Sequence, residues 1–434
     1  MSSGVLDPLR MTDQSPPTEL LRFATAGSVD DGKSTLLGRL LYDSKSLFED
    51  QIAAVEALSA SRGHEWADLS LFTDGLRAER EQGITIDVAY RYFATPRRRF
   101  IIADTPGHLQ YTRNMVTGAS TADVALILVD ARKRLVEQSR RHAFLCSLLR
   151  VPRLVLCVNK MDLVGWSGSV FHHIREEFSA FAAQLGVPEP AAIPISALHG
   201  DNIVSRSANM PWYDGPSLLD HLEGVHVASY RNLVDARFPV QYVIRPQSSG
   251  HPDYRGYAGQ IASGTLRPGD EVVVLPSGLT SVISSIETAD GPVPEAFPPM
   301  SVTIRLAGDL DVARGDMICV PHHPAAVTRE VEAMVCWMDD TRPLTPGGRY
   351  TVKHTTRSVR AVVSELSYRL DVNSLGRDTA ATSLSLNEIG LVRLRTMTPL
   401  LCDEYPRNRV TGSLIIIDET TNATVAAGMI TRTR

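Results

Sequence analysis

The residues best suited to chemistry lie in three short strings within the first 162 residues. The first is GSVDDGKST at Gly27 to Thr35, the second is DTPGH at Asp104 to His108, and the third is NKMD at Asn159 to Asp162. A glycine-rich loop before Lys and Ser suits phosphate groups, because its backbone N–H groups can point inward and the lysine adds a positive charge. Three such strings in this order predict a pocket that holds a triphosphate and reads a guanine base.

The first string is expected to cradle the phosphates. Gly27 and Gly32 leave the backbone open to phosphate oxygens, Lys33 supplies a cation for the β- and γ-phosphates, and the Ser34 hydroxyl is placed to ligate Mg²⁺. A plain glycine-rich turn after a strand is the alternative, and the full match to the pattern disfavours it. The nucleotide-binding residues expected here are Gly27, Ser28, Val29, Asp30, Asp31, Gly32, Lys33, Ser34 and Thr35.

The second string is expected to sense the last phosphate. Asp104 ends the strand-like run RFIIAD and can hold Mg²⁺ through water, while the N–H of Gly107 can approach the γ-phosphate. His108 then occupies the position that orients the attacking water in GTPases. The alternatives are a strand-ending turn and a histidine with no catalytic role. The binding residues expected here are Asp104, Thr105, Pro106, Gly107 and His108.

Thr85, in the string GITID, is the candidate for the second hydroxyl ligand of Mg²⁺. It lies between the first two strings, where a switch loop belongs. The same segment also reads as the start of a strand. With Lys33 and His108, Thr85 completes the expected catalytic set.

The third string is expected to choose the base. The carboxylate of Asp162 can accept the N1–H and N2–H₂ donors of guanine together, whereas adenine presents no such pair. Asn159 would steady the loop, Lys160 would lie along the ring, and a turn in ISALHG would present the Ala197 N–H to guanine O6. The residues expected at the base are Asn159, Lys160, Met161, Asp162, Ser196, Ala197 and Leu198.

The elements that must position these strings alternate between strand and helix. Apolar runs such as RFATAGS, RFIIADT, VALILVDA and RLVLCVNK predict strands, and LLGRLLYD, RNMVTGAS and FHHIREEFSAFAAQL predict helices. A parallel sheet with crossover helices follows, with the strings at the carboxyl ends of its strands. Short strand-like runs divided by turns follow Phe238 and predict two small β-barrels. The expected parts are a mobile tail over 1–19, an α/β P-loop GTPase domain over 20–228, and barrels over 229–327 and 328–434.

The composition is that of a globular protein. The 434 residues are 43% hydrophobic and 21% charged, and the net charge of -5 argues against a protein that coats nucleic acid. Five cysteines form no CxxC pair, and several lie in apolar runs that predict burial. No signal peptide or membrane-spanning run is found, so a cytoplasmic protein without a membrane partner is expected.

Two arginine runs lie outside the three strings. The run Arg97 to Arg99 is expected to form a solvated hairpin tip, and the run Arg132 to Arg134 is either a helix surface or a docking patch.

Longer strings give a resemblance to a family. DGLRAEREQGITIDVAYRYF at Asp74 to Phe93, FIIADTPGHLQYTRNMVTGAS at Phe100 to Ser120 and MPWYDGPSLLDHLE at Met210 to Glu223 closely resemble the GTP-binding large subunit of bacterial heterodimeric sulfate adenylyltransferase, or ATP sulfurylase. The resemblance continues from about Leu20 through VTGSLIIIDETTNATVAAGMI near the end of the chain. The wider family is that of the translation elongation factors, which share a GTPase domain followed by two β-barrels.

This resemblance implies a function in sulfate activation. A small catalytic partner subunit would join ATP and sulfate into adenosine 5′-phosphosulfate and pyrophosphate, and GTP hydrolysis on this chain would drive that uphill step. The cofactors would be GTP and Mg²⁺, and Asp30 would help to bind a monovalent cation. Val29 and Ile84 would form an apolar gate beside His108. An elongation factor-like carrier of aminoacyl-tRNA and a purely regulatory GTPase are the alternatives.

The sequence departs from this family at two positions. Leu109 replaces a usual acidic residue, and Arg134 stands where glycine is usual. Either could alter the interaction with the partner.

Overall fold

The computed structural model describes residues 19–45, 85, 87–108, 111–226, 232–246 and 254–433. The expected N-terminal tail up to residue 18, the gate residue Ile84 and the departure at Leu109 lie outside the described residues.

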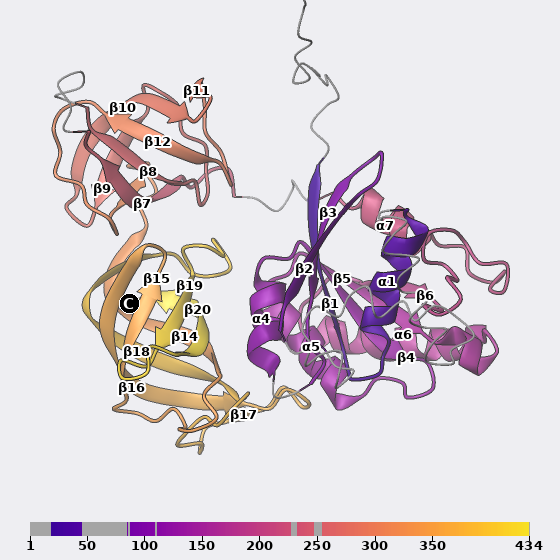
Figure 1. The fold of residues 1–434 in the computed structure, drawn as a ribbon. Coiled ribbons are helices and arrows are strands. Elements are labelled where there is room, and N and C mark those ends of the chain that lie inside the picture. The colour runs from indigo at the N-terminus through magenta and orange to yellow at the C-terminus, as the bar shows by residue number, and fades with distance from the viewer. Residues whose placement is uncertain are drawn as a thin grey trace, which may run out of the picture. The chain divides into compact units, whose positions relative to one another are not determined.

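A six-stranded sheet carries the three sequence strings (Figure 1). Its strand order is β2-β3-β1-β4-β5-β6, and all neighbours pair in parallel except β2, which is antiparallel to β3. The predicted parallel sheet is therefore confirmed, with an antiparallel edge strand added. Its strands are β1 (Leu20–Gly27), β2 (Ala89–Ala94), β3 (Arg99–Asp104), β4 (Val124–Asp130), β5 (Arg153–Asn159) and β6 (Ala191–Pro194).

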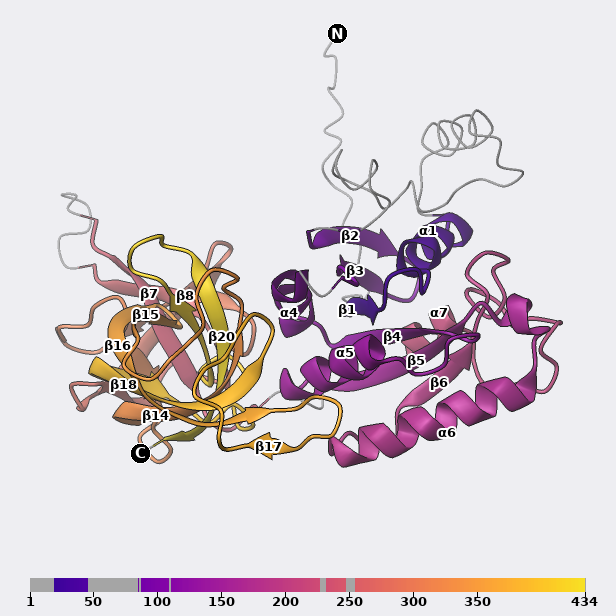
Figure 2. The same ribbon diagram turned by 90° about the horizontal axis from the view of Figure 1, so that it is seen from below.

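Helices connect these strands. Helix α1 packs against β1, and α6 packs against β5 and runs along the sheet in Figure 2. None of the helices in the described ranges is long and apolar enough to cross a membrane. The helical segments are α1 (Lys33–Asp43), α4 (Thr112–Ser120), α5 (Glu137–Leu148), the 3₁₀ turn η3 (Met161–Val164), α6 (Gly168–Gln184) and α7 (Leu218–Gly224).

The register of the sheet brings the strings to one edge. Thr25 of β1 lies beside Asp104 of β3, and Asp130 of β4 lies beside Asn159 of β5. Every residue of β4 is buried, as expected for an apolar strand in the middle of a parallel sheet. The one charged residue of this strand, Asp130, stands at its carboxyl end. The carboxyl ends of β3, β1, β4 and β5 thus follow one another along one edge of the sheet, which is where ligands bind in open α/β sheets.

The first β-rich region closes into a barrel. Its strands follow the order β11-β10-β12-β8-β7-β13-β9, and β9 also pairs with β10, which closes the ring. Phe238, Tyr257 and Ile304 are among its buried core residues. The strands are β7 (Arg237–Ile244), β8 (Gly256–Gln260), β9 (Glu271–Leu275), β10 (Leu279–Thr288), β11 (Gly291–Pro292), β12 (Ser301–Leu306) and β13 (Met317–Cys319).

The second β-rich region closes in the same way. Its order is β15-β19-β20-β14-β18-β16-β17, and β15 also pairs with β16. Trp337 is fully buried in its core, and its indole N–H donates to the carbonyl oxygen of Arg342 at 2.8 Å. The strands are β14 (Ala326–Trp337), β15 (Arg349–His354), β16 (Arg357–Leu370), β17 (Arg377–Asp378), β18 (Ile389–Cys402), β19 (Ser413–Ile417) and β20 (Thr424–Thr433).

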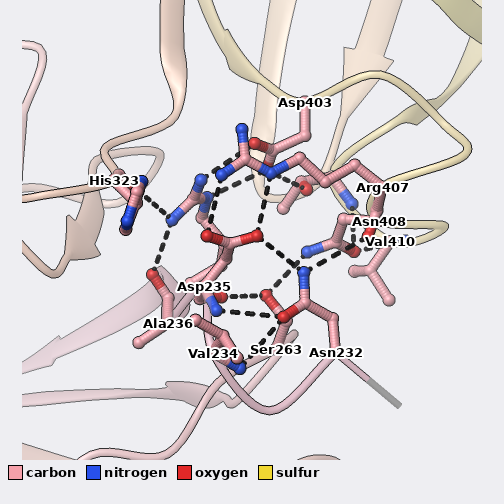
Figure 3. A network of polar contacts seen from close by, with 12 residues as sticks. Asn232, Val234, Asp235, Ala236, Ser263, His323, Asp403, Arg407, Asn408 and Val410 are labelled. Atoms are coloured by element: carbon pink, nitrogen blue, oxygen red, sulfur yellow. Dashed lines mark hydrogen bonds and ion pairs between the residues drawn. The ribbon is translucent and has the colours of Figure 1, made fainter. Parts of the chain in front are cut away.

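A network of ion pairs joins the two barrels (Figure 3). Arg237 of β7 is fully buried and donates through Nε and Nη2 to both carboxylate oxygens of Asp403, each at 2.9 Å. A second pair lies beside it, with the arginine and the aspartate on the opposite barrels. Arg407 donates to both carboxylate oxygens of Asp235 at 2.8 and 2.7 Å. Each barrel therefore supplies one arginine and one aspartate, and both pairs are bidentate.

Contacts divide the chain into two compact units. The first contains the six-stranded sheet, and the second contains both barrels together with parts of α4 and α5. The domain boundaries expected after residues 228 and 327 stay predictions.

The interpretation of the first arginine run was partly wrong. Residues 95–98 do form the turn between β2 and β3, and Arg97 is exposed. Arg98, however, is only 2% exposed, and its guanidinium donates to the carbonyl oxygens of Leu222 and Glu223 at the end of α7. A cation at the carboxyl end of a helix is favourable, so the middle arginine stabilises a helix instead of facing solvent.

Arg134 lies in a left-handed turn after β4, with φ of 59°. Glycine adopts this conformation without steric penalty, whereas other L-residues do not. The family's usual glycine suits this backbone conformation, whereas Arg134 adopts it at a steric cost. The arginine run lies in this turn and not on a helix surface.

Candidate functional site

The phosphate loop connects β1 to α1 and is shaped by its own residues. Gly32 has φ of 89°, and a Cβ at this position would collide with the side-chain amide of Asn159. Asp31 is buried, and its carboxylate accepts the backbone N–H of Ser28 at 2.7 Å. Burial raises the pKa of Asp31, although the Ser28 N–H and the Lys33 ammonium oppose that shift. The loop is thus closed by an internal carboxylate.

Lys33 points into this loop. Its Nζ donates to the carbonyl oxygens of Gly27 and Ser28, each at 2.9 Å, and the side chain is only 7% exposed. Burial lowers the pKa of Lys33, and the charges of Asp104 and Asp31 oppose that shift. A buried ammonium held by carbonyl groups is well suited to bind a phosphate, which would supply full negative charge.

The other residues of the first string occupy the loop and the first turn of the helix. Val29 is half-buried, Asp30 is exposed with φ of 66°, and Ser34 and Thr35 are half-buried at the start of α1. The Ser34 hydroxyl therefore lies directly after Lys33 at the amino end of a helix.

The DTPG segment approaches the phosphate loop closely. A Cβ on Gly107 would collide with Lys33 Nζ and would lie 2.7 Å from the carbonyl oxygen of Gly27, so only glycine fits here. Asp104 is buried, and its Oδ1 accepts the Thr25 hydroxyl at 3.0 Å. Thr105 and Pro106 are buried between them.

His108 and Thr85 are the two remaining members of the expected catalytic set. His108 is half-buried and follows Gly107 directly, and its ring meets that of Tyr111 edge-on with centroids 6.1 Å apart. Thr85 is half-buried and precedes β2 by a few residues. The strand that this segment was expected to enter is β2, which begins at Ala89, so Thr85 lies just before the strand and not within it.

Asn159 joins three segments of the site. Its Nδ2 donates to the carbonyl oxygen of Asp31 at 2.8 Å, and its Oδ1 accepts the backbone N–H groups of Lys160 and Ala197 at 2.8 and 3.0 Å. One buried amide therefore fixes the phosphate loop, the third string and the ISALHG turn against each other. The role of Asn159 as a brace for this loop agrees with these contacts.

Asp162 is half-buried in the 3₁₀ turn η3, and its two oxygens have different neighbours. Its Oδ1 accepts the hydroxyl of Ser196 at 2.7 Å, and its Oδ2 lies 3.8 Å from Nε2 of His199. Met161 is buried beneath this turn. Ser196 therefore orients the carboxylate that is expected to read the base.

A buried carboxylate outside the three strings holds Lys160. Asp130, at the end of β4, lies 3.1 Å from Lys160 Nζ and accepts Arg132 Nη2 at 2.7 Å. Burial alone would raise the pKa of Asp130, but hydrogen bonds from Arg132 and Lys160 hold it well below its usual range. The ionised form of Asp130 is thus favoured beside Lys160.

The structure brings most of the expected residues together at one edge of the sheet and adds others. Asp130, Thr25 and Gln138, whose Nε2 donates to the Gly107 carbonyl at 3.3 Å, were missed from the sequence. The available signal was weak: Thr25 and Asp130 are polar residues at or near the ends of buried apolar strands.

The donor set for a divalent metal consists of oxygens. Within the part of the chain that the structure describes, no three His, Cys, Asp or Glu side chains gather into a metal-binding group. Ser34 and Asp104 offer a hydroxyl and a carboxylate, which suit a hard cation that keeps water and phosphate ligands.

Two families match the sequence. The Elongation factor Tu GTP binding domain matches residues 18–237, and the GTP-eEF1A C-terminal domain-like family matches residues 330–431. A GTP-binding domain followed by an elongation factor-like C-terminal domain agrees with the architecture predicted from the sequence.

Individual relatives extend over nearly the whole chain. "Bifunctional enzyme CysN/CysC" of Mycobacterium tuberculosis (strain ATCC 25618 / H37Rv) is 66% identical over 96% of this chain and 68% of its own length. "Sulfate adenylyltransferase subunit 1" of Bacteroides fragilis is 52% identical over 98% of this chain and 88% of its own. The protein of that name from Alteromonas mediterranea is 49% identical over 98% and 89%.

Proposed function

Since this chain belongs to the family of sulfate adenylyltransferase subunit 1, a family with a GTP-binding domain of the elongation factor Tu type, we propose that it drives adenosine 5′-phosphosulfate formation by hydrolysing GTP. The adenylyl transfer itself takes place on a small partner subunit. ATP and sulfate react there to give adenosine 5′-phosphosulfate and pyrophosphate, and this chain supplies the energy.

The observation that carries this proposal is the position of Asn159. Its single amide holds the phosphate loop against the ISALHG turn, and this arrangement supports a ligand that carries both phosphates and a base. The carboxylate of Asp162 accepts the two donors on the edge of guanine, and Lys160 lies along the ring. Adenine would leave this carboxylate without a partner.

The phosphates bind between the first and second strings. Lys33 turns its ammonium from the Gly27 and Ser28 carbonyls toward the β- and γ-phosphates. Ser34, Thr85 and, through water, Asp104 hold Mg²⁺, which neutralises phosphate charge in the complex. The Gly107 N–H reaches the γ-phosphate because no side chain intervenes.

Hydrolysis requires a water molecule placed in line with the γ-phosphate. His108 orients this water, whose oxygen attacks phosphorus while the bond to the β-phosphate oxygen breaks, giving GDP and phosphate. Val29 lies on the apolar side of this position, and the exposed Asp30 helps to bind a monovalent cation. Loss of the γ-phosphate releases Gly107 and Thr85, so the GTP and GDP states differ in these segments.

Coupling requires that the partner distinguish these two states. A ligand or subunit that binds both forms equally shifts no equilibrium. The segments around Thr85 and after His108 are therefore the places where the small subunit senses the nucleotide.

The test is to purify the full chain with a candidate small subunit and to measure sulfate-dependent pyrophosphate release from ATP. We expect GTP to stimulate release and GDP not to do so. Absence of GTP stimulation in an active complex would refute the coupling. GTP-dependent binding of aminoacyl-tRNA would instead establish the elongation factor-like carrier, and GTP turnover unlinked to product would leave a regulatory GTPase.

A further inference from the structure

Arg39 contacts the ISALHG turn, which contains Ser196 and is expected to bind the base. The helix that carries Arg39 has none of the residues expected at the base. Arg39 lies in α1, and its side chain reaches across to the residues after Ser196. Nε donates to the carbonyl oxygen of Ala197 at 3.3 Å, and Nη2 donates to that of Leu198 at 2.6 Å. The forked guanidinium thus holds two successive carbonyl groups of one turn.

The turn rests closely on this arginine. Gly200 has φ of 81°, and a Cβ there would lie 3.6 Å from Arg39 Cδ and 3.3 Å from Asp43 Oδ2. Asp43, one helical turn after Arg39, accepts Nη1 at 3.4 Å. The side chain of Arg39 is 20% exposed, so its position is restricted by the helix on one side and the turn on the other.

Because the peptide bond is planar, the contact of Arg39 with the Ala197 carbonyl also sets the direction of the next N–H group. A trans peptide places the carbonyl oxygen of one residue and the N–H of the next on opposite sides. When Arg39 holds the Ala197 carbonyl, the Leu198 N–H must point away from Arg39. The Ala197 N–H, which the sequence placed at guanine O6, instead donates to Oδ1 of Asn159 in this structure. Leu198 N–H is therefore the amide of this turn whose direction Arg39 controls.

We propose that Arg39 is a positioning residue for guanine recognition, which orients the Leu198 N–H toward O6 of the base. This inference rests on the proposed function only in requiring a bound guanine nucleotide. Arg39 does not touch the base itself. It reduces the freedom of the turn before binding, so the hydrogen bond to O6 forms with less loss of entropy.

The test uses three diphosphates that differ at the base. GDP and inosine 5′-diphosphate both carry O6, whereas 2-aminopurine riboside 5′-diphosphate lacks O6 and keeps the 2-amino group. Dissociation constants are measured on the full chain by calorimetry for the wild type and for Arg39→Ala. We expect Arg39→Ala to weaken GDP and inosine diphosphate about 5- to 10-fold, as for loss of one hydrogen bond. The 2-aminopurine nucleotide should change less than twofold.

Arg206→Ala is the matched control, because Arg206 also donates to a loop carbonyl, that of Tyr213, away from this turn. It should leave all three constants unchanged. Arg39→Lys keeps a cation but not the fork, and should restore part of the affinity for the two O6-bearing nucleotides. If Arg39→Ala does not fold, the dissociation constants of the three diphosphates are compared between Arg39→Lys and the wild type instead, and this comparison tests the positioning role.

An equal loss for all three nucleotides, or none, would overturn the positioning role. Failure of the wild-type chain to bind GDP would instead refute the proposed function. The two failures are therefore distinguishable.

Discussion

At the scale of single residues, we expect recognition of the base to depend on one carboxylate, that of Asp162, whose orientation is already set. Ser196 engages Oδ1 of Asp162, and the backbone of η3 places the side chain beside the ISALHG turn. We expect Asp162→Asn to weaken GDP by about 10²-fold, because hydrogen bonds to a charged acceptor are lost. Xanthosine diphosphate, whose 2-oxo group can accept from the new amide, should gain affinity.

Competition binding of GDP and xanthosine diphosphate to both proteins checks this expectation. An unchanged preference for GDP would remove Asp162 from base recognition. Asp162→Glu serves as the control for charge without position, and it should lose GDP without gaining the xanthine nucleotide.

His108 is the second residue whose role can be isolated. We expect His108→Ala to bind GTP normally and to hydrolyse it about 10²-fold more slowly, because a group that orients the attacking water is lost. Single-turnover hydrolysis in the complex with the small subunit measures the effect. His173→Ala, which removes a histidine next to Arg134, is the control. Unchanged hydrolysis in His108→Ala would mean that another group orients the water.

At the scale of elements, the approach of the DTPG segment to the phosphate loop depends on a missing side chain. A Cβ on Gly107 meets both Lys33 Nζ and the Gly27 carbonyl. Gly107→Ala should therefore push these segments apart and weaken the binding of GTP more than that of GDP, by about tenfold, because in the proposed complex only GTP accepts from the Gly107 N–H. Fluorescence titration with both nucleotides tests this. Gly165→Ala is a control in the same domain, since a Cβ there has no neighbour within 4 Å, although its φ of 61° adds local strain.

The second barrel contains a buried histidine that predicts a dependence on pH. His354 is 1% exposed, and the hydrogen bond between its Nε2 and the Thr411 carbonyl is 2.7 Å long. Burial lowers the pKa of His354 below 6.5, although the contact with Thr411 opposes that shift. Below pH 6.5 the unfolded chain binds a proton that the folded barrel does not, so stability should fall as the pH decreases from 7 to 5.

The slope contributed by this one group is at most about 1.4 kcal/mol per pH unit. His354→Gln keeps an amide donor for Thr411 and removes the titration, so the slope between pH 7 and 5 should decrease. Urea unfolding at several pH values measures it. An identical slope in the variant would show that other groups cause the acid sensitivity.

At the scale of the whole molecule, the two barrels are joined by reciprocal charge pairs instead of an apolar surface alone. Arg237 and Asp403 are both buried, and Thr411 also donates to Asp403 at 2.7 Å. Hydrogen bonding to Arg407 and Asn232 lowers the pKa of Asp235 below its usual range, although burial opposes that shift. Two bidentate pairs, with four hydrogen bonds in all, allow little independent movement of the barrels, so we expect them to move as one body.

Arg237→Ala should destabilise this junction by about 3–5 kcal/mol, because it leaves the Asp403 carboxylate buried without its partner. The double variant Arg237→Met with Asp403→Leu should recover most of that loss, since both charges are removed. Thermal unfolding of the full chain compares the three proteins. Equal stability of Arg237→Ala and the wild type would contradict the role assigned to the pair.

The sequence by itself determined the fold class and the nucleotide. The three strings require particular residue types at fixed spacing, and the short apolar runs before them favour strands. The positions of Lys33 and Asn159 were predictable because the string that contains each residue also fixes its local structure. The family resemblance added the reaction, through long strings that no local rule explains.

Only the tertiary structure decided which other residues support these strings. Asp130 and Arg39 are ordinary polar residues in the sequence, and their contacts with Lys160 and with the Ala197 turn arise from the packing of separate strands and helices. Arg98 was assigned to solvent because adjacent arginines usually face it, but the end of α7 offers three carbonyl groups to its guanidinium. Contacts between residues distant in the chain depend on the register of the strands and on how the helices cross between them. Local sequence patterns do not encode either of these.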